Sequence, residues 1–267
     1  MFVNTVEPEQ ALWLLFHENK LIIHTPSGAL LHRSPGLLPF PLPDFHVVEQ
    51  TAHRRVHVAR IAAPELLTED YGLQGLRDLL LTGTTENFRL AATALQILEW
   101  DRNHRFCSHC GAPTQPHPKG ERAKVCTACH YAQYPRIQPC VIVAITRDDH
   151  ILLARAQRYA IPMYSLLAGF VEVGETLEEA VDREVAEESG VTVRDLRYFG
   201  SQSWPFPGNL MLAFRAEWDA GDIVIQEEEI MDAQFFHYRN LPMIPPPGSI
   251  AHDVIMAAVQ ELTARYG

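Results

Sequence analysis

The sequence lacks the features of a membrane or exported protein. No apolar run in its 267 residues reaches the roughly 20 residues that a membrane-spanning helix needs. The first ten residues, MFVNTVEPEQ, contain neither the basic segment nor the apolar stretch of a secretory signal. Positive charge is also scarce: the formal net charge of −11 disfavours a protein whose main role is sequence-independent binding of nucleic acid. We therefore expect a cytoplasmic protein with no membrane partner, in which nucleic acid could enter only through a specific pocket.

Cysteine is sparse, and its spacing points to metal binding instead of a disulfide framework. Four of the five cysteines form two C-x-x-C pairs separated by fifteen residues, namely Cys107, Cys110, Cys126 and Cys129. Four thiolates in this pattern give a tetrahedral Zn²⁺ site with no open position, so we predict one structural zinc per chain, with free thiols or a redox pair as the alternatives. A basic cluster between the pairs, Lys119, Arg122 and Lys124, is ordinarily a solvated loop, and contact with RNA is the alternative.

The first part of the chain is predicted to be an irregular, mostly β, N-terminal domain over residues 1–100. Strand-like segments at 12–16 and 20–24 are followed by a Pro-rich stretch at 35–43, and an apolar stripe at helical spacing predicts a closing helix at 88–100. The zinc module then occupies residues 101–133.

The remainder, residues 134–267, is predicted to be an α+β domain with helices against a mixed sheet. Two β-branched runs flank Asp148-Asp149, which predicts a hairpin. A helix over 176–189 begins with the capping box of Thr176 and Glu179 and ends at Gly190. The other predicted elements are strands at 196–202, 210–217 and 233–238 and a helix at 250–266.

The helix over 176–189 carries two sets of carboxylates. Three of them share a half of the helix with its apolar residues, at Glu184, Glu187 and Glu188, whereas Glu178, Glu179 and Asp182 lie on the opposite, solvated half. Carboxylates beside apolar neighbours repel one another and lose hydration unless a cation lies among them. The first set is therefore predicted to bind Mg²⁺ or Mn²⁺, with Arg183 orienting Glu187.

This segment resembles the Nudix box. All of the box's constrained positions are matched, by Gly169, Glu175, Arg183, Glu184, Val185, Glu187, Glu188, Gly190 and Val191. The resemblance implies a Nudix fold, a mixed sheet between helices, that hydrolyses a nucleoside diphosphate derivative with divalent metal ions. It further implies metal contacts by Ala168 and Glu229 besides the three box carboxylates. Arg183 joins the catalytic set, and the general base is either Glu187 or Glu229.

An aromatic, Pro-rich loop follows the box. Taken alone, its Trp204 and Phe206 either stack on a base or nicotinamide or merely cap the core. The segment 201–209, SQSWPFPGN, is similar to the motif of the NADH pyrophosphatase subgroup, with Ser203 where Pro is common and Asn209 in place of Ser. The resemblance implies cleavage of NAD(H) to NMN(H) and AMP and removal of the NAD cap from RNA. The implied substrate contacts are Gln202, Ser203, Trp204, Pro205, Phe206, Pro207, Gly208 and Asn209.

Single residues are carried over from the same subgroup. Phe170 and Tyr134 match an aromatic pair that sandwiches a purine, with the tyrosine donated by a second subunit, which implies a homodimer. Ala251 and Arg77 match further substrate contacts. Two alternatives to NAD(H) hydrolysis remain: a Nudix hydrolase of another nucleotide such as ADP-ribose, and a non-catalytic nucleotide or RNA sensor.

Overall fold

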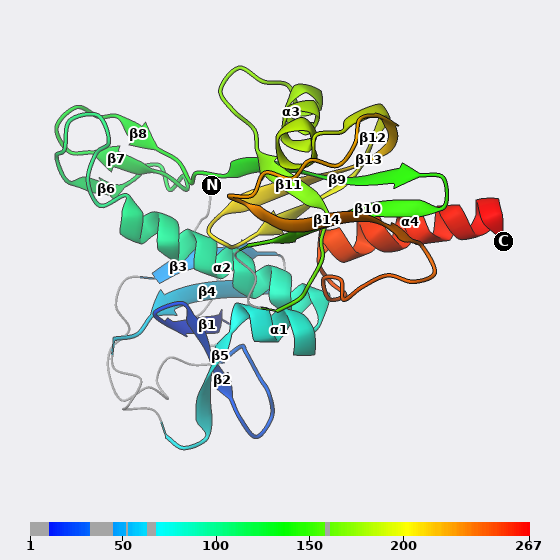
Figure 1. Cartoon of the computed structure of the whole chain (residues 1–267). Coiled ribbons are helices and arrows are strands. Elements are labelled where there is room, and N and C mark those ends of the chain that lie inside the picture. The colour runs from blue at the N-terminus through cyan, green and yellow to red at the C-terminus, as the bar shows by residue number, and fades with distance from the viewer. Residues whose placement is uncertain (1–10, 33–44, 52, 63–67, 158–160) are drawn as a thin grey trace. The chain divides into compact units, whose positions relative to one another are not determined.

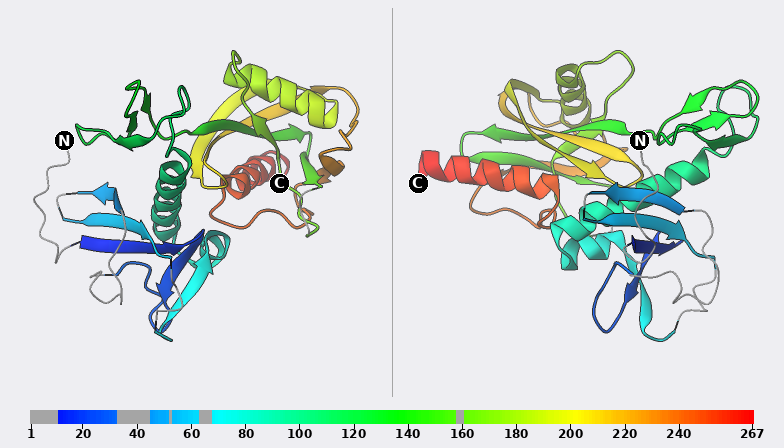
Figure 2. Two further views of the ribbon diagram at one scale, coloured as in Figure 1. Left: turned by 90° about the vertical axis from the view of Figure 1, so that its left-hand side faces the viewer. Right: turned by 180° about the vertical axis from the view of Figure 1, so that it is seen from behind.

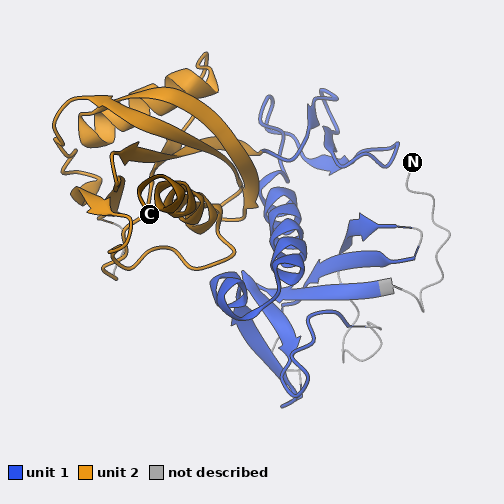
Figure 3. Ribbon diagram, turned by 90° about the vertical axis from the view of Figure 1, so that its right-hand side faces the viewer, with its two compact units in different colours: residues 1–136 blue, residues 137–267 orange. Residues whose placement is uncertain are grey.

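The chain divides into two compact units, residues 1–136 and 137–267 (Figure 3). The structure, a computed structural model, describes residues 11–32, 45–51, 53–62, 68–157 and 161–267. The predicted Pro-rich stretch at 35–43 falls outside them. No helix in these ranges is long and apolar enough to cross a membrane.

The first unit contains a five-stranded sheet in the order β3-β4-β1-β2-β5. Its strands are β1 (Ala11–His17), β2 (Lys20–His24), β3 (Phe45–Gln50), β4 (Arg55–Arg60) and β5 (Tyr71–Gly75). Only the β1–β4 pair is parallel among these pairings. Two helices follow, α1 (Leu76–Thr82) and α2 (Thr85–Asn103), and α2 packs against β1, β3 and β4 (Figure 2). A mostly β domain that ends in a helix is therefore confirmed, but α1 was not predicted.

The zinc module is a small sheet of β6 (Thr114–Pro116), β7 (Lys124–Cys126) and β8 (Ala132–Gln133). Two residues of its basic cluster are hydrogen-bonded to β3 and α2 of the same unit. The Arg122 guanidinium donates a hydrogen bond of 2.9 Å to the carbonyl oxygen of Val47. The Lys124 ammonium lies 2.8 Å from the Asp101 carboxylate and also donates to the Asp101 carbonyl. The expectation of a solvated basic loop is therefore wrong for Lys124, which is 8% exposed, whereas Arg122 is exposed although it is hydrogen-bonded.

The second unit is built on a mixed sheet in the order β12-β13-β9-β10-β14, with β11 paired to β9. Its strands are β9 (Gln138–Arg147), β10 (His150–Ala156), β11 (Leu167–Phe170), β12 (Thr192–Trp204), β13 (Asn209–Ala220) and β14 (Ile230–His237). The β13–β9 pair is parallel and the other pairs are antiparallel. The predicted hairpin at Asp148-Asp149 is present and joins β9 to β10.

Two helices cover opposite faces of this sheet, α3 (Leu177–Ser189) and α4 (Ile250–Tyr266) (Figure 1). Alternation along β9 explains both cores, because successive side chains of a strand point to opposite faces. Val141 and Val143 pack with α3 residues, whereas Ile142 and Ala144 pack with α4 residues. The predicted fold class, a mixed sheet between helices, is confirmed.

Candidate active site

Helix α3 begins and ends where its sequence signals predicted. The Thr176 hydroxyl accepts the Glu179 backbone N–H, and the Glu179 carboxylate accepts the Thr176 N–H, which completes the capping box. Gly190 ends the helix in the left-handed region at φ 72°, which glycine adopts without strain. These two ends fix which side chains of α3 point toward β11.

Gly169 in β11 lies directly against the carboxylate of Glu184 in α3. A Cβ atom built on Gly169 would lie 1.9 Å from Glu184 Cδ and 2.0 Å from its Oε1. No side chain at position 169 is compatible with that approach. The glycine of the box thus has a steric function: because it has no side chain, the Glu184 carboxylate can lie against the backbone of β11.

The guanidinium of Arg183 joins three carboxylates and one backbone carbonyl. Its Nε and Nη2 lie 2.5 Å and 3.0 Å from the two oxygens of Glu175, a bidentate pair. Its Nη1 donates to Glu184 at 2.8 Å and to Glu187 at 3.1 Å. The Nη2 group also donates to the carbonyl oxygen of Phe170. Arg183 therefore orients the carboxylates of α3 and holds the end of β11 beside them.

The pKa values of this group reflect the contacts. Pairing with Arg183 lowers the pKa of Glu175 to about 2. Burial raises the pKa of Glu184 above its ordinary value, and the negative charges of Glu187 and Glu229 add to that effect. Glu229 therefore lies near enough to act on Glu184 electrostatically.

The three box carboxylates differ in exposure. Glu188 is buried at 5% exposed, and the Glu184 side chain is 15% exposed. The Glu187 side chain is 54% exposed, so the expectation that it shares the apolar half of α3 is wrong in that respect. The solvated trio was predicted correctly, since Glu178, Glu179 and Asp182 are all exposed.

The thiols are gathered more tightly than the carboxylates. The sulfur atoms of the four cysteines all lie within 4.8 Å of one another. In the described ranges, the oxygen atoms of the box carboxylates form no set as close as this. The physical reason is that like charges repel and that the Arg183 guanidinium lies among the carboxylates of Glu175, Glu184 and Glu187.

The aromatic loop connects β12 to β13 at the end of the sheet. Its rings are half-buried, and those of Trp204 and Phe206 meet edge to face with centroids 5.4 Å apart. The Asn209 amide donates to the carbonyl oxygen of Phe206 at 3.4 Å and is 6% exposed. Asn209, which stands where the motif has Ser, therefore forms a hydrogen bond within the loop itself. Of the other loop residues, Pro205 is buried, Gly208 is half-buried, and Ser203 and Pro207 are exposed.

The remaining predicted contacts fall in both units. Ala168 and Phe170 lie on β11, where Phe170 is 49% exposed, and Ala251 lies in the first turn of α4. In the first unit, Arg77 is exposed on α1, and Tyr134 is 54% exposed with its hydroxyl donating to Glu121 at 3.0 Å.

One pair of hydrogen bonds near the site was not predicted from the sequence. The side-chain amide of Gln202 is hydrogen-bonded to the backbone of Gly248 and Ile250 at the start of α4. No pattern in the local sequence indicates these two hydrogen bonds. The cap signal of Ser249 before the helix was the available hint.

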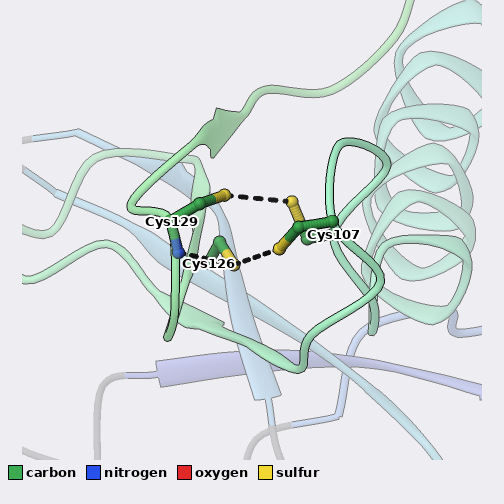
Figure 4. Close-up of side chains that lie close together, drawn as sticks. Cys107, Cys126 and Cys129 are labelled. Atoms are coloured by element: carbon green, nitrogen blue, oxygen red, sulfur yellow. Dashed lines mark hydrogen bonds between the residues drawn. The ribbon is translucent and has the colours of Figure 1, made fainter.

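The four cysteines form the predicted zinc site, and Figure 4 shows three of them, Cys107, Cys126 and Cys129, with their sulfur atoms close together. The Sγ atoms of Cys107 and Cys129 are 3.7 Å apart, and those of Cys110 and Cys126 are 3.4 Å apart. Tetrahedral Zn²⁺ with bonds near 2.3 Å requires sulfur atoms about 3.8 Å apart, so the thiols fit this ion. Backbone N–H groups of Cys129 and Ala128 lower the pKa of the Cys126 thiol to about 6, which favours the thiolate that a metal binds.

Three family models match consecutive parts of the chain. The NUDIX domain matches residues 136–259, the NADH pyrophosphatase zinc ribbon domain residues 102–134, and the NADH pyrophosphatase-like rudimentary NUDIX domain residues 10–100. The chain is similar in structure to a NUDIX hydrolase from Nitrosomonas europaea, with a TM-score of 0.52 and 25% identity over 59% of this chain and 91% of the other. Fold and site thus define a Nudix hydrolase that carries a structural zinc ribbon.

Two similar proteins of the same class identify the family of the chain. The chain is 41% identical over 274 aligned residues to the NAD-capped RNA hydrolase NudC of Salmonella heidelberg (strain SL476), covering 97% of this chain and 96% of the relative. It has the same identity and coverage with the NAD-capped RNA hydrolase NudC of Salmonella typhi. The chain therefore belongs to the NudC family.

Proposed function

We propose that the protein hydrolyses the pyrophosphate bond of NAD(H), giving NMN(H) and AMP, and that it removes the NAD cap from RNA 5′ ends by the same cut. The observation that carries the proposal is the 41% identity to NAD-capped RNA hydrolases over 96% of their length. The Arg183 network and the adjoining aromatic loop support it, because they provide oriented carboxylates and stacking surfaces.

In this reaction a water oxygen bonds to one phosphorus, the P–O bond to the bridging oxygen breaks, and each product keeps one phosphate. Divalent Mg²⁺ or Mn²⁺, when bound, neutralises the phosphate oxygens and lowers the pKa of water. Glu184, Glu187, Glu188, Glu229 and the backbone of Ala168 would hold the ions. Arg183 orients two of these carboxylates, Glu184 and Glu187. The water proton passes to Glu187 or Glu229, which are both exposed.

The rest of the proposed site binds the substrate. The loop residues Ser203–Asn209 and the backbone of Gln202, with Phe170 and Ala251, would contact the nucleotide, and Arg77 is proposed as a further contact. Tyr134 would complete the purine site of a second copy, so a homodimer is part of the proposal. We also propose a cytoplasmic location, where the four thiols remain available to zinc.

The test is a substrate panel combined with one matched pair of variants. Initial rates with Mg²⁺ or Mn²⁺ are compared for NADH, NAD⁺, ADP-ribose, diadenosine polyphosphates and NAD-capped RNA. We expect Glu188→Gln to abolish turnover, because it removes a charge at constant volume from a buried carboxylate. Glu178→Gln, on the exposed half of the same helix, is the control and should keep the parent rate.

A parent-like rate in Glu188→Gln would refute the metal-binding role of that residue. Turnover of ADP-ribose without turnover of NADH or NAD-capped RNA would refute the substrate assignment. No turnover with any substrate would favour the sensor alternative.

A further inference from the structure

Gln202 lies on β12 with both ends of its side-chain amide engaged by the backbone. Its Nε2 donates to the carbonyl oxygen of Gly248 at 2.7 Å, and its Oε1 accepts the N–H of Ile250 at 2.8 Å. These partners flank the residue that caps α4, Ser249. Strand β12 and the start of α4, far apart in the sequence, are therefore joined by one side chain.

The two hydrogen bonds complete the capping of α4. The first N–H groups of a helix have no partner within it, so other groups must accept them. The Ser249 hydroxyl accepts the N–H of His252, and Gln202 accepts that of Ile250. The backbone N–H between them belongs to Ala251, the residue proposed to contact the nucleotide.

The turn that precedes α4 is also held by hydrogen bonds. Gly248 is in the left-handed region at φ 89°, and the Ser249 hydroxyl donates to the carbonyl oxygen of Pro246 at 2.8 Å. The Gln202 bond to Gly248 holds this turn against the strand that leads into the aromatic loop two residues later. The position of Ala251 relative to that loop thus depends on Gln202.

We propose that Gln202 is a positioning residue, which fixes the start of α4 and so places Ala251 beside the aromatic loop, and that its side chain is not itself a ligand of the substrate. This inference rests on the proposed function for the role of Ala251. It assigns a structural reason to the Gln of the motif, since the side-chain amide offers both a donor and an acceptor without charge.

The experiment compares Gln202→Met with Gln260→Met in the full-length protein. Both changes replace a glutamine by an uncharged side chain of similar length, and Gln260 is exposed on α4, ten residues beyond Ile250. Amide hydrogen exchange at Ile250 is followed by NMR without substrate, and kcat and KM are measured with NADH. Because a neutral hydrogen bond contributes about 1 kcal/mol, we expect Gln202→Met to speed exchange at Ile250 and raise KM, each about fivefold to tenfold, with kcat within about twofold. Gln260→Met should change none of them.

Gln202→Glu keeps the experiment informative where Gln202→Met does not fold. The carboxylate still accepts the Ile250 N–H but cannot donate to Gly248, so exchange at Ile250 and KM should both rise, and both by less than in Gln202→Met. Slow exchange at Ile250 together with a raised KM in Gln202→Met would overturn the proposal, because Gln202 would then contact the substrate directly. Fast exchange with an unchanged KM would overturn it too, because the start of α4 would not place the substrate.

The proposed function fails separately from this inference. A parent protein that does not cleave NADH refutes the former, and KM is then measured with whichever panel substrate it cleaves. The exchange rate at Ile250 needs no substrate at all.

Discussion

Replacing Gly169 by Ala should disable the site without unfolding the protein. The new Cβ would lie 1.9–2.1 Å from the three carboxylate atoms of Glu184, whereas ordinary contacts exceed 3.4 Å, so the carboxylate must move by about 1.5 Å. Mg²⁺ requires ligand oxygens at 2.0–2.1 Å in a nearly octahedral arrangement, and a misplacement of about 1 Å can lower a rate about 100-fold. We therefore expect kcat/KM for NADH to fall at least about 100-fold.

The assay needs two readouts and one control. Steady-state kinetics with NADH give kcat/KM, and titration calorimetry with Mn²⁺ gives the metal affinity, which should fall as well. Thermal unfolding should change little, because the displaced Glu184 can turn toward solvent and a partly exposed ion pair contributes about 1 kcal/mol or less. Gly200→Ala is the matched control, since a Cβ there meets no atom within 4 Å. Parent-like kinetics and Mn²⁺ affinity in Gly169→Ala would refute the reasoning.

Two further predictions concern the first unit. Cys107→Ser should release zinc and destabilise the ribbon by several kcal/mol, because metal binding contributes folding free energy to so small a module; full zinc content by mass spectrometry with unchanged melting would contradict it. Asp101→Asn should lower the free energy of unfolding by about 2 kcal/mol at pH 7. Burial alone would raise the pKa of Asp101, but hydrogen bonds from His46 and Lys124 outweigh it and lower the pKa from 3.8 to about 2. A lowered folded-state pKa stabilises above the unfolded value, so the difference between parent and variant should shrink as the pH falls from about 4 to about 2. A difference that is constant with pH in denaturant titrations would argue against this pair.

Features set by neighbouring residues could be predicted from the sequence. The start and end of α3 follow from Thr176, Glu179 and Gly190, which act within one or two turns of the helix. The zinc site follows from two local pairs of cysteines whose chemistry leaves few alternatives. The α4 boundaries were also predicted, because an apolar periodicity runs through the whole helix.

Features that depend on distant contacts could not be predicted. The parallel pairing of β1 with β4 joins segments more than forty residues apart, and no local pattern specifies it. The short helix α1 has no side-chain cap to mark its start at Gly75. Likewise, Lys124 was expected to be solvated but is buried, since its partner Asp101 lies 23 residues earlier in the chain.

The charges around Glu184 explain why Arg183 alone does not complete this site. Glu175, Glu184, Glu187, Glu188 and Glu229 carry five negative charges when ionised, against the one positive charge of Arg183. Glu175 takes the bidentate half of the guanidinium, and its lowered pKa records that pairing. Glu184 keeps a raised pKa although it touches the same guanidinium, since it is more buried and faces Glu187 and Glu229. The uncompensated charge therefore lies around Glu184, whose carboxylate meets β11 at Gly169, and a divalent cation would gain most from it there.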